Sequence, residues 1–539
     1  MSCEFNLLDE PWIRVLNKDC VVSQVSWKDA LLHAEDYVDL AGELPTQDIA
    51  ILRQLLAMLY SIFLHQNVAG NVEELQSVND SYERWNQLWQ TGHFPAEPIQ
   101  EYCSKWHDRF WLFHEARPFG QTISAQKGTE YTAAKLNGAI SESSNKSRLF
   151  PGRIGGGKET LSYAEAARWL IYTNAYDDTS AKPKGKNLPS VGAGWLGKIG
   201  LIQAVGNNLF ETLMLTLVLA KDGDEGWKEG SANWELDQVR EDERMKIHLP
   251  ENPSDLLTLQ SRRLYLKRKN NLITGFYLLG GDFFDREGAY AEQMTVWRRT
   301  PGKKNEPDII QPRRHDASRQ MWRDLASIIE QSDDSKSGHL PGVVSWVSRL
   351  KTRKLLSNNE KVRFRIASVQ YGDKDFFVTD VFGDSLLFHS DLLTQAGYTC
   401  RKLALDEIKR CDTLAYYVGQ LANELCLASG SDTKKSFEES PKTEIYYRLD
   451  EPFRIWLEQL NPDDPDELDD LRKQWREQSE KIVMTYGKEL ADSAGPQAFI
   501  GRYVDQKENG KEIKKHYSTS EAYNKFQYLV RKTANKMEG

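Results

Sequence analysis

The chain has 539 residues, of which 40% are hydrophobic and 28% are charged, and its formal net charge is −9. A chain of this length exceeds what one hydrophobic core can organise, so at least two domains are expected. The composition is ordinary for a globular protein and excludes wholesale disorder. The net negative charge argues against a broad basic face that binds naked DNA unaided, but it allows local basic loops.

Several classes of protein are disfavoured by short sequence features. The longest apolar runs, such as 213–220, fall far below the roughly 20 residues that a membrane span needs. The first ten residues carry Glu4, Asp9 and Glu10 instead of the basic start and apolar core of a secretory signal. The six cysteines form no C-x-x-C pair, which removes the usual spacing of a structural zinc site. We therefore expect a cytoplasmic protein without a membrane partner, a metal or a cofactor.

The first 400 residues mix helical and strand-like patterns. The segment 5–15 predicts two short strands around a turn at Pro11. Apolar residues at three- and four-residue spacing across 52–63 predict a helix, and two further helices are predicted over 163–172 and from about 209 to 219.

The stretch from 261 to 380 is rich in short β-like runs. Strands are predicted at 264–267 and 272–277, and apolar residues alternate with polar ones in 362–366 and 376–378. The turn-forming residues 371–375 separate the last two runs, so this stretch predicts a β-hairpin with its tip at Gly372–Asp375.

The chain beyond residue 400 is nearly all helical in pattern. Four apolar stripes mark four long helices, at 414–425, 449–460, 468–490 and 523–530. Trp456 and Trp475 lie on these stripes and are expected in the core. Together the patterns predict an α+β protein, with a large mixed α/β domain over 1–400 and a C-terminal four-helix bundle over 401–539.

The nearest approach to an enzyme motif is the glycine-rich run from Gly152 to Lys158. It fits the phosphate-binding pattern G-x-x-x-x-G-K, but Glu159 stands where a Ser or Thr hydroxyl would hold Mg²⁺. The dipeptide His315-Asp316 has no second cluster of metal ligands at a convincing spacing. We therefore predict that the chain is not an enzyme, with a nucleotide-dependent enzyme that uses 152–158 as the alternative.

Basic clusters are concentrated between residues 182 and 365 of a chain that is acidic overall. They are typical of phosphate contacts, or else of solvated strand edges and loops in a purely structural scaffold subunit. The clusters are Lys182–Lys186, Arg262-Arg263, Lys267–Lys269, Arg298-Arg299, Lys303-Lys304, Arg313-Arg314 and the cations within 349–354.

Four segments, in order along the chain, resemble the CasA family, the large subunit of the type I-E CRISPR Cascade complex. They are Phe5–Val15, Phe110–Thr122, Leu256–Arg263 and Gly495–Arg502. The resemblance implies a non-catalytic subunit that recognises the protospacer-adjacent motif (PAM) in duplex DNA and promotes strand separation and R-loop formation. It also implies four kinds of partner: the target duplex, the 5′ handle of the guide RNA, the other Cascade subunits, and a helicase-nuclease recruited after target binding.

The same resemblance implies four elements that contact nucleic acid or a neighbouring subunit. A strand lysine that reads the minor groove corresponds to Lys269, with Lys267 as the fallback. A hairpin wedge corresponds to Gly372, Asp373, Lys374 and Asp375, where the family glutamine is absent. A loop that allows close backbone approach corresponds to the stretch with Ser180, Ala181, Lys182 and Lys184, where the family glycine run is absent. A guide-handle or neighbouring-subunit loop corresponds to Asn145, Arg148, Leu149, Phe150 and Arg153.

Overall fold

The fold is known from a computed structural model, which describes residues 3–138, 152–180, 183–223, 225–303, 306–330, 338–356, 361–431, 436–508 and 511–535. Contacts divide the chain into two compact units. The first contains Met1–Ala317, Ser327–Ser357 and Val362–Ser385, and the second contains Ser318–Ala326, Asn358–Lys361 and Leu386–Gly539. Among the described helices, none combines the length and the apolarity needed to cross a bilayer.

The first unit is built around helices whose apolar faces are buried. α2 (Pro45–Phe63) runs through its core with nearly every apolar side chain buried, which confirms the helix predicted over 52–63. α6 (Tyr163–Tyr176) and α7 (Leu209–Thr216) confirm the other two predicted helices. The remaining helices that begin in this unit are α1 (Trp27–Leu32), α3 (Val78–Thr91), α4 (Ala96–Trp106), α5 (Ala133–Leu136), α8 (Pro253–Leu257) and α10 (Gly342–Thr352), while α9 (Leu325–Ile329) begins in the second unit and ends in the first.

Small antiparallel sheets complete the first unit. β1 (Glu4–Asn6) pairs with β5 (Trp111–Phe113), and β2 (Ile13–Asn17) lies between β3 (Val22–Val25) and β4 (Tyr37–Leu40). The two strands predicted within 5–15 therefore exist, but each belongs to a different sheet. β10 (Trp297–Thr300) pairs with β11 (Ile309–Pro312).

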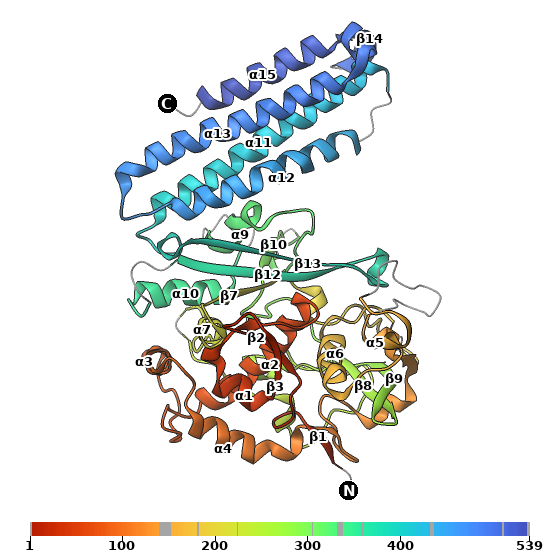
Figure 1. Cartoon of the computed structure of the whole chain (residues 1–539), viewed down its shortest axis with the longest axis vertical. Helices are drawn as coiled ribbons and strands as arrows, with labels where there is room; N and C mark the ends of the chain where they lie inside the picture. Colours follow the sequence, from red (N-terminus) through yellow and green to blue (C-terminus); the bar gives the residue numbers. More distant parts are fainter. Residues whose placement is uncertain are drawn as a thin grey trace. The chain divides into compact units, whose positions relative to one another are not determined.

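Two sheets carry the segments that were predicted to contact nucleic acid. In one, β9 (Leu272–Gly280) lies between β6 (Thr129–Thr132) and β8 (Arg262–Lys269). In the other, β12 (Lys361–Tyr371) lies between β7 (Leu201–Val205) and β13 (Val378–His389). β12 and β13 form the predicted hairpin, whose tip lies on the side of α5 and α6 (Figure 1).

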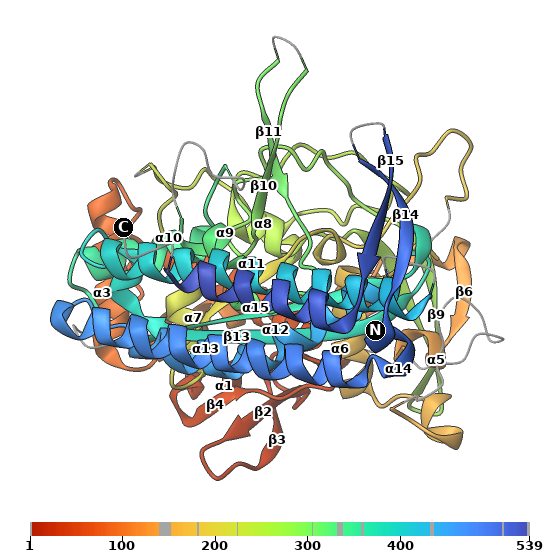
Figure 2. The same cartoon turned by 90° about the horizontal axis from the view of Figure 1, so that it is seen from above.

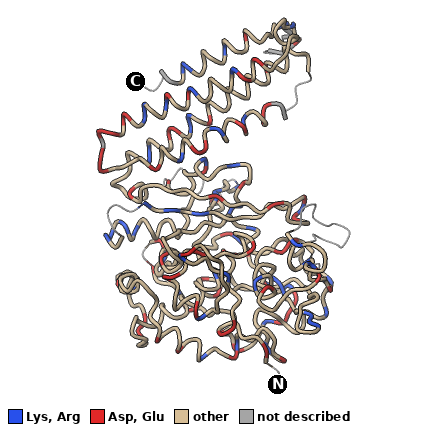
Figure 3. The backbone as a smooth tube through the Cα atoms, in the orientation of Figure 1, with Lys and Arg blue, Asp and Glu red and all other residues tan. Residues whose placement is uncertain are grey.

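Four long helices form the bundle of the second unit and confirm the four predicted stripes. α11 (Tyr398–Ser429), α12 (Ser436–Gln459), α13 (Pro465–Ser493) and α15 (Thr519–Asn535) run side by side (Figures 1 and 2). Trp456 and Trp475 are buried in the bundle core and stack with ring centroids 5.6 Å apart, as predicted. Lys and Arg are interspersed with Asp and Glu along these helices (Figure 3).

One element of the second unit was missed from the sequence. Between α14 (Gly495–Ile500) and α15, strands β14 (Arg502–Glu508) and β15 (Lys511–Tyr517) pair in register from Arg502↔Tyr517 to Glu508↔Lys511 (Figure 2). The expectation of an almost entirely helical segment after residue 400 is wrong here. The Asn509-Gly510 dipeptide is a hairpin signal, but the flanking runs are too charged to show an apolar alternation.

Asp48, near the start of α2, makes the stability of the first unit depend on pH. Its Oδ1 accepts a hydrogen bond from the Gly42 amide at 2.6 Å. Burial raises the pKa of Asp48 to about 7, with Asp39 adding to the rise while Gly42 and Arg365 oppose it. The native state therefore holds a proton, over the window between the usual aspartate pKa and about 7, that the unfolded chain has released. Stability falls as the pH rises through that window.

We expect Asp48→Asn to raise the free energy of unfolding at about pH 8 by about 1–2 kcal/mol, a value discounted for partial solvent screening. At about pH 4 the substitution should have little effect, because native and unfolded chains then hold similar numbers of protons. Urea unfolding at the two pH values measures the difference. An equal gain at both would mean that titration of Asp48 is not its cause.

Candidate nucleic-acid interface

A buried arginine holds the chain where α6 ends. Asp177 and Asp178 follow Tyr176, the last residue of α6, and both are buried. Arg262, at the start of β8, donates from Nε to Asp177 Oδ2 at 2.6 Å. Its Nη2 donates to the carbonyl oxygens of Asp177, Asp178 and Gly192 at 3.2, 2.9 and 2.7 Å. Because one planar guanidinium satisfies all these acceptors, the course of the loop after α6 is fixed.

The Arg262-Arg263 pair is therefore internal. The two side chains are 1% and 0% exposed, and Arg263 is paired with the buried Asp282. The hypothesis that this cluster contacts phosphate is wrong for both residues. Buried charges of this kind persist only with opposite charges and hydrogen-bond partners around them, and β8 supplies both arginines from its buried half.

The fixed loop continues to Ser180, which is only 3% exposed. Its amide donates to Asp178 Oδ1 at 2.8 Å, and its carbonyl oxygen accepts from the Tyr131 hydroxyl at 3.1 Å. Lys135 secures Asp178 from the other side at 2.7 Å. Ala181 and Lys182 lie outside the described residues. Lys184 is exposed, and its amide donates to Glu243 Oε1 at 2.6 Å.

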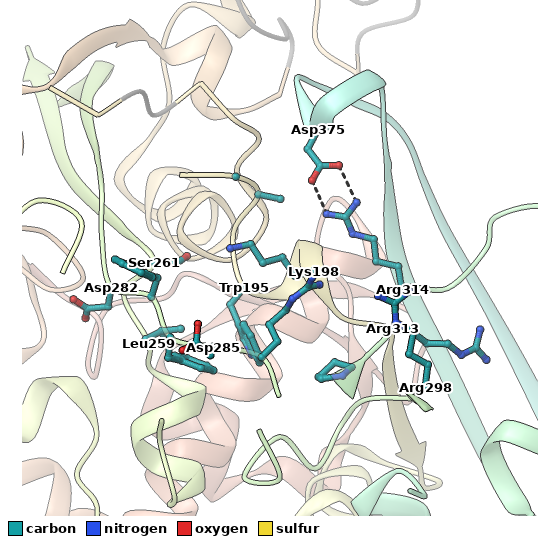
Figure 4. A pocket seen from close by; sticks show the side chains of 16 residues that line it. Trp195, Lys198, Leu259, Ser261, Asp282, Asp285, Arg298, Arg313, Arg314 and Asp375 are labelled. Carbon is teal, nitrogen blue, oxygen red and sulfur yellow. Dashed lines mark hydrogen bonds and ion pairs between the residues drawn. The ribbon is translucent and has the colours of Figure 1, made fainter. Parts of the chain in front are cut away.

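The tip of the β12–β13 hairpin is anchored to this same loop. The Tyr371 hydroxyl donates to the Tyr176 carbonyl oxygen at 2.7 Å, and the Thr179 amide donates to the Asp375 carbonyl oxygen at 3.1 Å. Arg314 grips the Asp375 carboxylate with two hydrogen bonds of 2.8 Å each, which Figure 4 draws as dashed lines. Bidentate pairs of this kind fix orientation as well as distance.

Beyond these anchors the tip itself is exposed. Asp373 and Lys374 face solvent, whereas Asp375 is half-buried. Lys374 and Asp375 have φ values of 54° and 60°, in the left-handed region that side chains other than glycine rarely occupy. The tip is closed by hydrogen bonds from the Gly372 amide to the Phe377 carbonyl oxygen at 2.8 Å and from the Asp375 amide to the Gly372 carbonyl oxygen at 3.1 Å. The hairpin thus presents two charged side chains on a constrained turn.

The end of β8 carries three consecutive cations with different surroundings. Lys267 pairs with Glu130 at 2.5 Å, and Arg268 pairs with Glu4 while its guanidinium lies 4.5 Å from the Phe113 ring centroid. Lys269 is exposed and forms no ion pair with any residue that the structure describes. Of the three cations, Lys269 is thus the one without a carboxylate partner among the described residues, so its ammonium breaks no ion pair with them when it meets a ligand.

This strand end connects to the fixed loop through the sheet. Lys267 lies opposite Gly275 of β9, which lies opposite Thr132 of β6. Thr132 is the neighbour of Tyr131, whose hydroxyl bonds Ser180. Two strand spacings of about 4.8 Å each separate the Lys267 backbone from β6. The β8 end, the loop and the hairpin tip are thus joined by direct contacts within the first unit.

Arg153 is already paired with two carboxylates and is only partly exposed. Its guanidinium pairs with Glu43 at 2.9 Å and with Glu165 at 2.9 Å, at the edge of a cavity of 440 Å³. The other residues predicted for the guide-handle loop, Asn145, Arg148, Leu149 and Phe150, lie outside the described residues.

The glycine-rich run does not have the geometry of a nucleotide-binding loop. In such loops the Gly-Lys-Ser/Thr end opens a helix directly, so that backbone amides cradle the phosphates. Here Gly155–Lys158 forms a short 3₁₀ turn, the Lys158 carbonyl oxygen accepts from the Asn137 side chain, and α6 begins only at Tyr163. The Ser162 hydroxyl and the Glu165 carboxylate cap that helix instead.

One group of residues in the second unit has metal-ligand chemistry. Ligand atoms of His389, Asp391 and Asp463 lie within 4.8 Å of one another. The Nδ1 of His389 already accepts a hydrogen bond from the Asp391 amide at 3.3 Å. We assign no metal to this group, because exposed carboxylates commonly gather without one.

The chain matches the family described as CRISPR-associated protein Cse1 over residues 6–486. The chain belongs to the Cse1 family. A curated relative, the CRISPR-associated protein CasA/Cse1 of Thermus thermophilus, is 31% identical over 220 residues, and the matched region spans 40% of this chain and 40% of that protein. The resemblance drawn from the four sequence segments is confirmed.

Solved structures extend the likeness to the whole fold. Cse1 of Thermobifida fusca superposes with a TM-score of 0.80 at 26% identity, covering 98% of each chain. A chain of a CRISPR RNA-guided surveillance complex superposes with a TM-score of 0.69 at 14% identity, covering 98% of this chain and 100% of that chain. The α+β class with a C-terminal four-helix bundle is thereby confirmed for this member of the Cse1 family.

The residues that anchor the hairpin were not singled out from the sequence. The sequence predicts only a turn for Tyr371, a place in the hairpin wedge for Asp375 and a basic cluster for Arg314, with no anchoring role for any of them. Tyr371 meets a residue 195 positions away, and Arg314 meets one 61 positions away. A single sequence carries no periodic or spacing signal for contacts of that range.

Proposed function

We propose that this Cse1-family chain is the non-catalytic large subunit of a type I-E Cascade complex. In this role it recognises the PAM in duplex DNA, promotes strand separation and R-loop formation, and helps to recruit the helicase-nuclease. Its other partners are the 5′ handle of the guide RNA and the remaining Cascade subunits. Family membership supports the general assignment, and the fold shared with a chain of a surveillance complex is compatible with it.

The observation that carries the DNA-opening role is the anchored hairpin tip. A wedge that separates the first base pair must hold the bases apart against restacking, and unstacking costs a few kcal/mol of free energy per base step. Tyr371 and Asp375 tie the turn to a loop that Arg262 holds rigidly. Asp373 and Lys374 then project from a rigid support, which suits insertion beside a base pair.

PAM recognition is assigned to Lys269 in preference to Lys267. Binding of DNA by Lys267 would first break its 2.5 Å pair with Glu130. Lys269 has no such competitor among the described residues, so its full charge is available to minor-groove acceptors or to phosphate. Minor-groove contacts distinguish A·T from G·C only coarsely, which suits a subunit that accepts several PAM sequences.

The experiment compares duplex binding by the reconstituted guide-RNA complex with and without this chain, on targets that differ only in the PAM. We expect omission of the chain to lower binding of the target with a PAM to the level of the target without one. Lys269→Ala should weaken binding of the target with a PAM by about tenfold, which lies within the binding free energy of about 1–3 kcal/mol that one contact to a base contributes.

Lys267→Ala is the matched control, because it removes the same charge two residues earlier and leaves Glu130 unpaired. We expect a change of less than about threefold, since an exposed pair contributes little. Equal binding with and without the chain would refute the PAM-recognition role and favour a structural scaffold. Loss of binding with Lys267→Ala but not with Lys269→Ala would keep that role and assign the PAM contact to Lys267.

A further inference from the structure

A cavity of 680 Å³ lies behind the hairpin tip, within the first unit. Figure 4 shows the Arg314–Asp375 pair at its hairpin end, with Lys198 and Trp195 beside it. The walls come from stretches that are far apart in the sequence: the segment after α6, the residues just before β8, the segment after β9, the strands β10 and β11 with the residues that follow, and Asp375 of the hairpin tip. Of the residues predicted to contact nucleic acid, the basic-cluster arginines Arg298, Arg313 and Arg314 line this cavity, whereas Lys267 and Lys269 do not.

The cavity carries an excess of positive charge. Five cations line it, Lys198, Arg286, Arg298, Arg313 and Arg314, against three carboxylates. The carboxylates are already neutralised. Asp282 pairs with Arg263 and Arg240, and Asp285 pairs with Lys246, all three cations standing outside the lining; Asp375 takes Arg314. In a chain with net charge −9, this is a local reversal of sign.

Two of these cations have no side-chain partner in the described part of the chain. Neither the Lys198 ammonium nor the Arg286 guanidinium forms a hydrogen bond or an ion pair with any described residue. Burial, together with the nearby Arg262, Arg244, Arg286 and Arg314, lowers the pKa of Lys198 to about 7. Burial, with Arg298 and Arg314, also lowers the pKa of Arg286. Keeping like charges together in a partly desolvated space destabilises the empty protein.

Part of the lining next to these charges is aromatic. Trp195 and Phe284 are nearly buried and pack against each other with ring centroids 4.6 Å apart. The Trp195 indole is held in place by Glu292, which accepts from its Nε1 at 2.8 Å. Arg244 covers Phe283, another lining residue, at 4.1 Å from the ring centroid. A rigid aromatic surface next to uncompensated cations is the combination that binds a base and its phosphate together.

We infer that this cavity is a nucleotide-binding site, in which Lys198 and Arg286 hold the phosphate and the Trp195–Phe284 wall receives the base. The volume exceeds what a mononucleotide needs and lies within the range of small-molecule sites. A free nucleotide and an unpaired nucleotide within a strand offer the same chemistry. The inference goes beyond the proposed function and does not require it, because the site is formed by the isolated chain.

The test is calorimetric titration of the full-length chain with 5′-deoxyadenosine monophosphate, deoxyadenosine, inorganic phosphate and a short single-stranded oligonucleotide. We expect the monophosphate to bind more tightly than either deoxyadenosine or phosphate alone. Lys198→Met should weaken its binding at least tenfold, and Arg286→Met should act in the same direction. Lys228→Met, which removes an exposed lysine paired with Glu251 away from the cavity, should change binding less than twofold.

A second readout separates a binding residue from a packing residue. Lys198→Met removes an ammonium that other cations surround, so it should raise the unfolding temperature of the ligand-free chain while weakening ligand binding at least tenfold. Tighter binding of the oligonucleotide, lost in Lys198→Met, would identify a strand as the source; binding of the monophosphate alone would identify a free nucleotide. No binding by the wild-type chain, undiminished binding by Lys198→Met, or a lower unfolding temperature in that variant would each overturn the inference.

Discussion

Replacing Arg262 by Met should lower the free energy of unfolding of the first unit by about 3–5 kcal/mol. The substitution keeps the aliphatic volume but leaves the buried Asp177 carboxylate without its 2.6 Å partner. It also leaves three carbonyl oxygens, those of Asp177, Asp178 and Gly192, without their common donor. Each unsatisfied buried acceptor adds to the cost, so the effect should fall at the upper end of the range for single substitutions.

Arg268→Met is the matched control on the same strand, because Arg268 forms an exposed pair with Glu4. We expect it to cost less than about 1 kcal/mol. Urea unfolding of both variants measures the difference, and the double variant Asp177→Leu with Arg262→Met should recover part of the loss, since no charge is then left unpaired. Equal effects of Arg262→Met and Arg268→Met would contradict the clamp role of Arg262.

Replacing Asp375 by Ala should slow strand separation by about a hundredfold, because the wedge then loses the rigidity that offsets the few kcal/mol of unstacking. The carboxylate makes two 2.8 Å hydrogen bonds to Arg314, and without it the tip keeps only its backbone tie to Thr179 and the Tyr371 anchor. The measurement is permanganate reactivity of thymines next to the PAM in target DNA bound by the reconstituted complex.

Two controls distinguish the effect of the tip's shape from the effects of its charge and of PAM recognition. Lys374→Gly removes the charge but keeps a residue that adopts the left-handed conformation at φ 54°, so its effect should be less than about threefold. A target with a pre-opened mismatched bubble beside the PAM should restore R-loop formation to Asp375→Ala and not to Lys269→Ala. If the bubble fails to rescue Asp375→Ala, or if Lys374→Gly is equally slow, rigid wedging is not the mechanism.

The position of the site within the fold was predictable to the level of segments. The β12–β13 hairpin follows from two alternating runs around a turn-forming stretch, and β8 follows from its β-like composition. The conformation within those segments was not predictable. Whether Ser180 faces solvent or the interior depends on a hydrogen bond to Tyr131, 49 positions away, and the tip geometry depends on Arg314 and Thr179.

The sequence by itself determined the α+β class, the four apolar stripes of the bundle and the Cse1 family. Helix and strand periods are local, and family segments are read directly from residue order. Only the tertiary structure decided which cations are available to a ligand. Arg262 and Lys269 stand on one strand and look alike in the sequence, yet Arg262 is enclosed with a carboxylate 85 positions away, while Lys269 extends into solvent. Burial and pairing decide the fate of a charge, and both depend on residues that folding brings together from distant parts of the chain.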